Sequence, residues 1–383
     1  MMLFIYFVIV VSFIDTMAQL PILSPFVSSL GASALLIGII MGAYSFSNML
    51  GNLGAGLVID QFGRKVGIVG GMLVAGVAVM LYAWVTEPTQ LLWLRILHGI
   101  GGAILIPAAF TYAGDLASSR TSSTAKSMGY AGAAVGIAAL LGPMLAGIGK
   151  ERFGYESVFL AIGSILVVTA ILAFIFLKET YSRKESNLQK LTVEEFKRLL
   201  YCNKLKIAYL SGFSLMFSMG VLAYAFPLNL ESIGFTSKET GLLFSVFSIV
   251  AIIVFLLPVN RLSDYYGRYV PLAIGFFVIT ITLTLLPFAK EIYQFIMLMI
   301  FYGCGFGLIF PAMTAIIVDE TDTNCRGTTF GIFYAAFSLG VFLGPIVGGM
   351  SVQFYFEPFW SASIIFIFVQ WLFYNIKRKI SKT

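Results

Sequence analysis

Three ionisable side chains stand inside apolar stretches of the sequence: Asp15, Arg95 and His98. A charge at the centre of a bilayer costs about 2.5–3.5 kcal/mol, so such residues usually face a water-filled cavity or a partner. Burial favours the protonated form of Asp15, as a proton carrier requires, whereas a nearby cation favours the carboxylate. His98 is the better second proton group, because imidazole changes charge near neutral pH. These residue types therefore indicate proton coupling.

Each of these residues also has a structural interpretation. Asp15 can be an ion-pair partner that only stabilises the fold, and His98 can be a packed core residue. Arg95 can reach Asp15 along its aliphatic stem or extend to the headgroups. At 1.5 Å per residue, Asp15 lies about 18 Å into its predicted helix and Arg95 about 7 Å into another, with His98 one turn deeper. On this count neither depth matches that of Asp15 well.

The elements that carry these residues must be membrane-spanning helices. The 383-residue sequence is 59% hydrophobic and only 11% charged, with a mean hydropathy of +0.94, which excludes a soluble protein of this length. A helix needs about 20 apolar residues to cross roughly 30 Å of hydrocarbon, and the apolar runs are too long for barrel strands. The first span shows no cleavage site and is predicted to be a signal-anchor. We predict twelve spans, at residues 3–28, 34–59, 67–86, 90–114, 127–149, 155–177, 207–230, 239–260, 270–288, 292–316, 328–352 and 358–376.

Other chemistries have little support in the sequence. Three scattered cysteines and one histidine predict neither a disulfide framework nor a metal site, so we expect no metal and no cofactor. Gly51, Gly54 and Gly56 lie inside an apolar helix without a following G-K-[ST], which favours helix packing over a nucleotide loop. An enzyme is not expected, because no nucleophile accompanies Asp15 and His98. An ion gradient is then the expected energy source.

The basic residues predict the orientation of the chain. If the N-terminus is cytoplasmic, the inner segments hold 19 of the 24 Lys and Arg residues. The outer loops hold only Lys150, Arg152, Lys238 and Lys290. This bias predicts that both termini lie in the cytoplasm of a bacterium, with the chain in its inner membrane. It also accounts for the net charge of +6 without a nucleic-acid partner.

The sequence repeats itself at an offset of 202–204 residues. Two parallel copies of six helices predict an all-α membrane protein of two six-helix bundles related by pseudo-twofold symmetry, with a substrate site between them. The predicted domains are 1–177 and 207–383, joined by a cytoplasmic linker at 178–206 in which Thr192 and Glu195 form the capping box of a short amphipathic helix. The repeated residues are Gly31, Gly38, Asp60, Gly63, Arg64, Gly99, Gly101, Pro107, Ala108, Asp115, Gly142 and Pro143, which recur as Gly234, Gly241, Asp264, Gly267, Arg268, Gly303, Gly305, Pro311, Ala312, Asp319, Gly344 and Pro345.

These residues resemble the major facilitator superfamily over essentially the whole chain, and its drug:H+ antiporter branch in particular. Residues 56–65 are similar to motif A, with Gln61 in place of the usual basic residue, and residues 95–101 are similar to motif B, with His98 where Gln is common. The antiporter glycine pattern keeps Gly129, Gly142, Pro143 and Gly147 in the fifth span, where Ala138 and Ala146 replace two glycines. It is complete in the eleventh span, at Gly331, Gly340, Gly344, Pro345, Gly348 and Gly349.

The resemblance implies that motif A and its repeat form a latch that holds one access state; the alternative is a solvated loop that only follows the charge bias. It also implies export, although small residues serve ordinary helix packing as well. The latch residues are Gly56, Asp60, Gly63, Arg64, Lys65, Asp115, Asp264, Gly267, Arg268 and Asp319.

The leading hypothesis is a monomeric, proton-coupled exporter of drug-like or amphipathic molecules that works by alternating access. The alternatives are an exporter dedicated to a siderophore, sugar or lipid precursor, an uptake symporter, and a receptor or scaffold that transports nothing. An aromatic and amide-bearing cavity would suit an amphipathic or neutral molecule, although each such residue can instead belong to the core or face lipid. The predicted cavity residues are Tyr44, Asn48, Tyr112, Tyr224, Phe226, Asn229 and Tyr302.

Overall fold

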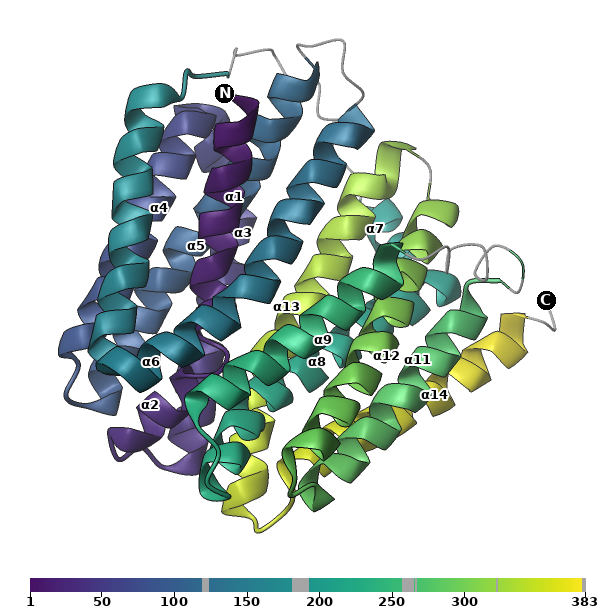
Figure 1. Cartoon of the computed structure of the whole chain (residues 1–383). Coiled ribbons are helices and arrows are strands. Elements are labelled where there is room, and N and C mark those ends of the chain that lie inside the picture. The colour runs from purple at the N-terminus through teal and green to yellow at the C-terminus, as the bar shows by residue number, and fades with distance from the viewer. Residues whose placement is uncertain (119–123, 181–192, 257–264, 266, 322, 381–383) are drawn as a thin grey trace. The chain divides into compact units, whose positions relative to one another are not determined.

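The computed structural model describes residues 1–118, 124–180, 193–256, 265, 267–321 and 323–380, and over these residues it contains helices but no strand (Figure 1). This confirms the predicted all-α fold. The helices before residue 180 are α1 (Met2–Ala18), α2 (Leu23–Ser29), α3 (Ala34–Phe62), α4 (Arg64–Leu81), η1 (Tyr82–Trp84), α5 (Pro88–Ser118) and α6 (Thr124–Phe176). The later helices are α7 (Val193–Tyr201), α8 (Asn203–Ser232), α9 (Ser237–Leu256), α11 (Tyr269–Leu285), η2 (Leu286–Phe288), α12 (Ile292–Asp319), α13 (Thr323–Gln353) and α14 (Pro358–Ile380).

The described helices provide the predicted twelve crossings. Ten of them are long and apolar enough to cross a membrane, and α1 with α2, bent by 46° relative to each other, count as an eleventh. Helix α6 is 53 residues long and leaves helical geometry at Gly154, so it contains two crossings and raises the number to twelve. The two crossings meet at Gly154, inside the predicted connection at 150–154, but that connection is helical except at this single glycine. The break between α1 and α2 coincides with Pro21, which cannot continue a helical hydrogen-bond ladder.

The chain divides into two compact units. The first comprises Met1–Glu185 with Phe226–Ser245, and the second comprises Ser186–Ala225 with Val246–Thr383. The segment 226–245, which the repeat places in the second half of the sequence, thus groups with the first unit. The predicted domain boundaries at 177 and 207 remain a prediction. In the linker, α7 confirms the predicted short helix, whereas Thr192 and the side chain of Glu195 lie outside the described residues.

The sequence repeat is matched by equivalent packing inside each unit. A methyl group added at Gly71 of α4 would come within 2.8 Å of the carbonyl oxygen of Gly101 on α5. At the equivalent positions, a methyl group at Gly275 of α11 would come within 2.8 Å of the carbonyl oxygen of Gly305 on α12. Glycine is required at both contacts because the two helix backbones approach too closely for a side chain. The duplication has therefore kept its helix-to-helix geometry.

Candidate functional site

Asp15 and His98 form a buried pair between α1 and α5. The Nε2 atom of His98 lies 2.6 Å from Oδ2 of Asp15, and the two residues are 0% and 3% exposed. The other ring nitrogen, Nδ1, lies 3.1 Å from the hydroxyl of Tyr82 in η1. In one arrangement Asp15 is ionised, Nε2 of a neutral imidazole donates to it, and Nδ1 accepts from the Tyr82 hydroxyl. In the other, both ring nitrogens carry hydrogen, and the contact between His98 and Asp15 is an ion pair. The pair can therefore hold a proton at either residue.

Arg95 is connected to this pair through Gln19. Nη1 of Arg95 donates to Oε1 of Gln19 over 2.7 Å, and Nε2 of Gln19 donates to Oδ1 of Asp15 over 3.0 Å. The guanidinium also donates to the carbonyl oxygens of Ile40 and Met41 on α3, at 3.3 and 3.0 Å, and lies over the ring of Tyr44. Its charge is thus compensated by carbonyl dipoles and a ring face. Arg95 does not extend to the headgroups.

The depth comparison made from the sequence was wrong for His98. Helix α5 begins at Pro88, two residues earlier than predicted, and it runs antiparallel to α1, so His98 reaches the depth of Asp15. A direct contact between Asp15 and Arg95 does not form, because Gln19 stands between them. Gln19 was missed since it carries no charge. Its position one turn after Asp15 was the available signal, because residues four apart share a helix face.

The second half carries a neutral counterpart of the buried pair. Ser218 on α8 and Tyr302 on α12 are hydrogen-bonded over 2.8 Å, and they stand 203 and 204 residues after Asp15 and His98. The neighbouring ring is duplicated as well: Tyr44 lies 4.7 Å from the His98 ring, and Phe247, 203 residues later, lies 5.4 Å from the Tyr302 ring. The same positions therefore hold a titratable pair in one half and two hydroxyl groups in the other.

Arg64, at the start of α4, contacts Asp115, another residue of the predicted latch. Its Nε lies 3.2 Å from Oδ2 of Asp115, and its Nη1 donates to the carbonyl oxygen of Ile59. Gly63, with φ at +98°, makes the tight turn between α3 and α4 that brings Arg64 into this position. The surroundings of Gly56 and the side chain of Asp60 lie outside the described part of the structure.

Glu179, which follows α6, binds the first turn of α4. Its two carboxylate oxygens accept hydrogen bonds from the backbone N–H groups of Arg64 and Lys65, at 2.9 and 3.1 Å. The next residue, Thr180, donates to Asp115 over 3.0 Å. A carboxylate at a helix N-terminus satisfies orphan N–H groups and complements the helix dipole. The sequence interpretation missed Glu179 because it assigned the residue to a surface linker.

The ion pair is repeated in the second half. Nε of Arg268 lies 2.8 Å from Oδ2 of Asp319, and the two residues are 51 positions apart, as are Arg64 and Asp115. Gly267 precedes Arg268 with φ at +82°. Asp264 lies outside the described residues. Both pairs are partly exposed, so each contributes at most about 1 kcal/mol.

The glycines of the antiporter pattern allow close helix packing. On α13, a side chain at Gly340 or Gly344 would overlap the backbone of α8, and the ring of Tyr224 packs on Gly348. On α6, Gly142 faces α1, and the contact between Gly147 and the backbone of Ser237 lies inside the first unit. Gly129 and Gly331 have open space around them, whereas Pro143 and Pro345 each lie within a continuous helix.

The predicted cavity residues differ in exposure. Tyr112 is buried, and its hydroxyl donates to the carbonyl oxygen of Lys178. Tyr302 is buried against Ser218, as described above. Three others keep part of their surface accessible: Tyr44, Asn48 and Asn229. Tyr224 and Phe226 are buried. Whether any of them contacts substrate remains a prediction.

Comparison with known proteins gives consistent results. The family model described as Major Facilitator Superfamily matches residues 5–203 and 208–382. The chain is similar to Multidrug resistance protein 2 of Bacillus subtilis, at 27% identity over 89% of this chain and 86% of that protein. It is also similar to the multi-drug resistance efflux pump PmrA of Streptococcus pneumoniae, at 26% identity over 91% and 88%. Its fold matches the crystal structure of a bacterial homologue of the human lysosomal transporter Spinster, with a TM-score of 0.84, 13% identity, and coverage of 100% of this chain and 97% of that one.

Proposed function

Since the chain belongs to the major facilitator superfamily, we propose that it exports drug-like or amphipathic small molecules in exchange for protons. It is a multi-pass membrane transporter rather than an enzyme. The names of the two curated relatives, a multidrug resistance protein and a multi-drug efflux pump, support the substrate class. The proposal includes a monomer whose two termini are cytoplasmic, in the inner membrane of a bacterium, driven by the proton gradient without a cofactor.

The buried Asp15–His98 pair is the observation that carries the proposal. A proton arriving at Asp15 removes the negative charge that attracts His98, and so weakens the charge-assisted contact between α1 and α5. Gln19 and Arg95 extend this effect to α3, because the guanidinium is bonded to two carbonyl oxygens of that helix. Three helices of the first unit thus respond to one proton. Release of the proton restores the attraction, which provides the two states that exchange transport needs.

Motif A and its repeat are proposed to set the equilibrium between access states. The Arg64–Asp115 and Arg268–Asp319 ion pairs would form in one access state and break in the other. Since each pair contributes at most about 1 kcal/mol, breaking one shifts that equilibrium by at most about fivefold. Such weak contacts suit a latch that must open in every cycle.

The test uses purified protein in liposomes with an imposed pH gradient. The movement of a lipophilic cationic dye, of a neutral antibiotic and of a metallophore is followed while the internal pH is recorded. We expect dye and proton to move in opposite directions, and Asp15→Asn to abolish accumulation against the gradient while leaving membrane insertion intact.

Ser218→Ala is the matched control, because Ser218 occupies the repeat-equivalent position of Asp15 in a neutral pair. It should keep the dependence of transport on pH. Uphill dye accumulation by Asp15→Asn with the pH profile of the wild-type protein would refute the coupling role. Transport of the metallophore alone would instead favour the dedicated metabolite exporter.

A further inference from the structure

The hydrogen bonds around Asp15 have a direction that the chemistry of Arg95 determines. A guanidinium only donates, so the atom of Gln19 that lies 2.7 Å from Nη1 of Arg95 must be the oxygen Oε1. The amide nitrogen of Gln19 is therefore the atom that faces Asp15, and it donates to Oδ1 over 3.0 Å. The other carboxylate oxygen, Oδ2, faces Nε2 of His98. Both oxygens of Asp15 thus face a nitrogen atom, and one of these nitrogens has to be a donor.

Tyr82 determines which ring nitrogen of His98 carries hydrogen. Tyr82 is fully buried, and within the described residues its hydroxyl has one acceptor, Nδ1 of His98 at 3.1 Å. Arg95, the other polar side chain near this hydroxyl, can only donate. If Nδ1 carried hydrogen, the hydroxyl hydrogen of Tyr82 would be buried without an acceptor, which is costly. Tyr82 therefore donates to Nδ1, and the ring hydrogen lies on Nε2, where it faces Asp15.

The charges around His98 favour the same arrangement. The titratable and charged side chains around the ring are Asp15 from α1, Tyr44 from α3, Tyr82 from η1 and Arg95 from α5. With a neutral imidazole, the charges of Arg95 and an ionised Asp15 add up to zero. An imidazolium would leave a net positive charge buried within the span, which the bilayer disfavours. The hydrogen-bond directions and the charge balance thus agree on a neutral ring.

We propose that His98 is a positioning residue that stays neutral during transport, while Asp15 binds the transported proton; this assignment rests on the proposed function. A proton that binds Asp15 adds an acid hydrogen to a carboxyl group whose two side-chain partners, Gln19 and His98, are both donors. Neither partner can accept that hydrogen. The contact between α1 and α5 must therefore open when Asp15 is protonated, and it re-forms when the proton leaves. The imidazole gains and loses no proton in this cycle.

NMR spectroscopy of the ring nitrogens tests the neutral state of His98 directly. His98 is the only histidine in the sequence, so ¹⁵N-labelled histidine in the full chain reports on this ring alone. In nanodiscs we expect a protonated Nε2 and an unprotonated Nδ1 at every pH at which the liposomes transport dye. Two protonated nitrogens, or a hydrogen on Nδ1, would overturn the assignment. This measurement does not depend on whether transport is coupled to protons.

His98→Gln separates positioning from proton binding. A glutamine offers a donor to Asp15 and an acceptor to Tyr82, but its amide does not take up a proton. Turnover should fall several-fold because the amide differs in shape from the ring, whereas the number of protons exchanged per dye molecule should remain that of the wild type. His98→Leu offers neither group and should lose uphill dye accumulation.

Dye movement without proton exchange in His98→Gln, in an assay where the wild type exchanges protons, would show that the imidazole carries the proton and would refute the assignment. Dye movement without proton exchange in the wild type would instead refute the proposed function. The NMR signals of His98 would still decide the state of the ring in that case.

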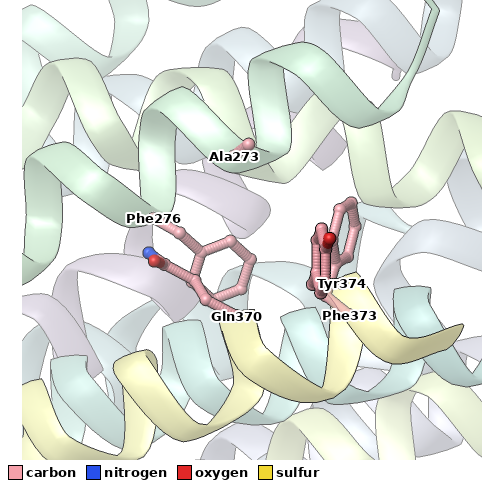
Figure 2. Close-up of a pocket in the computed structure, with 5 residues that line it drawn as sticks. All are labelled: Ala273, Phe276, Gln370, Phe373 and Tyr374. Atoms are coloured by element: carbon pink, nitrogen blue, oxygen red, sulfur yellow. The ribbon is translucent and has the colours of Figure 1, made fainter. Parts of the chain in front are cut away.

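Gln370→Leu is the matched control for His98→Leu, because it also removes polar atoms from a span. Figure 2 shows Gln370 of α14 beside Phe276 of α11, in the second unit. The buried Nε2 atom of Gln370 makes no hydrogen bond, so no donor or acceptor loses a partner there. This variant should keep both the proton-to-dye ratio and the NMR signals of His98. Loss of the ratio in both leucine variants would mean that His98→Leu acts through general destabilisation, which would count against the positioning role.

Discussion

Replacing Glu179 by glutamine should loosen the start of α4. The carboxylate accepts from the N–H groups of both Arg64 and Lys65, one at each oxygen. A glutamine keeps one acceptor oxygen, so one of these bonds is lost together with the negative charge. Loss of a helix N-cap costs about 0.5–2 kcal/mol, and the charge–dipole interaction adds about 0.3–1 kcal/mol. Because Glu179 is exposed, we expect the total destabilisation of the first turn of α4 to lie near the lower end of the two contributions combined, at about 1 kcal/mol.

Hydrogen–deuterium exchange measures this effect directly. A destabilisation of about 1 kcal/mol raises the population of the open first turn about fivefold, and the amides of Arg64 and Lys65 should exchange faster by that factor. Peptides that cover residues 60–68 report on these amides in detergent or nanodiscs. Glu194→Gln is the matched control, because Glu194 is an exposed carboxylate on α7.

Gly63→Ala provides an independent route to the same result. A methyl group at Gly63 would overlap the carboxylate of Glu179, and the φ of +98° disfavours any residue with a side chain. This variant should therefore also expose the amides of Arg64 and Lys65. Combined with Glu179→Gln, it should add little at these amides, since the cap is already lost. Unchanged exchange in Glu179→Gln would show that the carboxylate does not hold the helix start.

Two further changes test the packing and the polar network. Gly344→Ala should lower the thermal unfolding temperature, because the added methyl group would overlap the α8 backbone at an overpacking cost of about 1–3 kcal/mol. Gly331→Ala is the control, since Gly331 has open space around it and the change should be neutral or stabilising. Equal unfolding temperatures for the two variants would contradict the close approach of α13 to α8. Gln19→Leu should destabilise the protein by about 1–3 kcal/mol because a buried donor of Arg95 loses its acceptor, and Gln19→Glu, which restores an acceptor, should recover part of that loss in the same thermal assay.

The arrangement of helices followed from the sequence because lipid restricts the possibilities. Each crossing needs about 20 apolar residues with its backbone bonded internally, so apolar runs translate into spans almost directly. The exception was residues 150–154, where charged residues predicted a loop. There the helix continues to Gly154, whose positive φ makes the bend within a single residue. Composition indicates that a crossing ends, but not how many residues the turn takes.

The candidate site followed from the sequence only in part. Asp15, Arg95 and His98 were found because charge is rare inside spans, yet their pairing depended on where each helix begins and which face it turns inward. Gln19 and Glu179 were missed for opposite reasons. An uncharged amide is inconspicuous in an apolar helix, and a carboxylate is inconspicuous in a charged linker. Both acquire their roles from backbone and guanidinium groups distant in the sequence.

The two halves share a scaffold but differ in chemistry. The first and fourth membrane spans of each half make a polar contact. Asp15 on α1 pairs with His98 on α5, and Ser218 on α8 pairs with Tyr302 on α12. A hydroxyl pair satisfies its own hydrogen bonds without any charge, so burying it carries little penalty. The acid–imidazole pair is bordered by Gln19 and Arg95, and this additional network supplies the polar partners that ionisable groups buried within a membrane span require. Within the described residues, the duplicated position therefore holds an acid–imidazole pair with a supporting polar network in the first half and a neutral packing contact in the second, which is why we assign the proposed proton coupling to the first half.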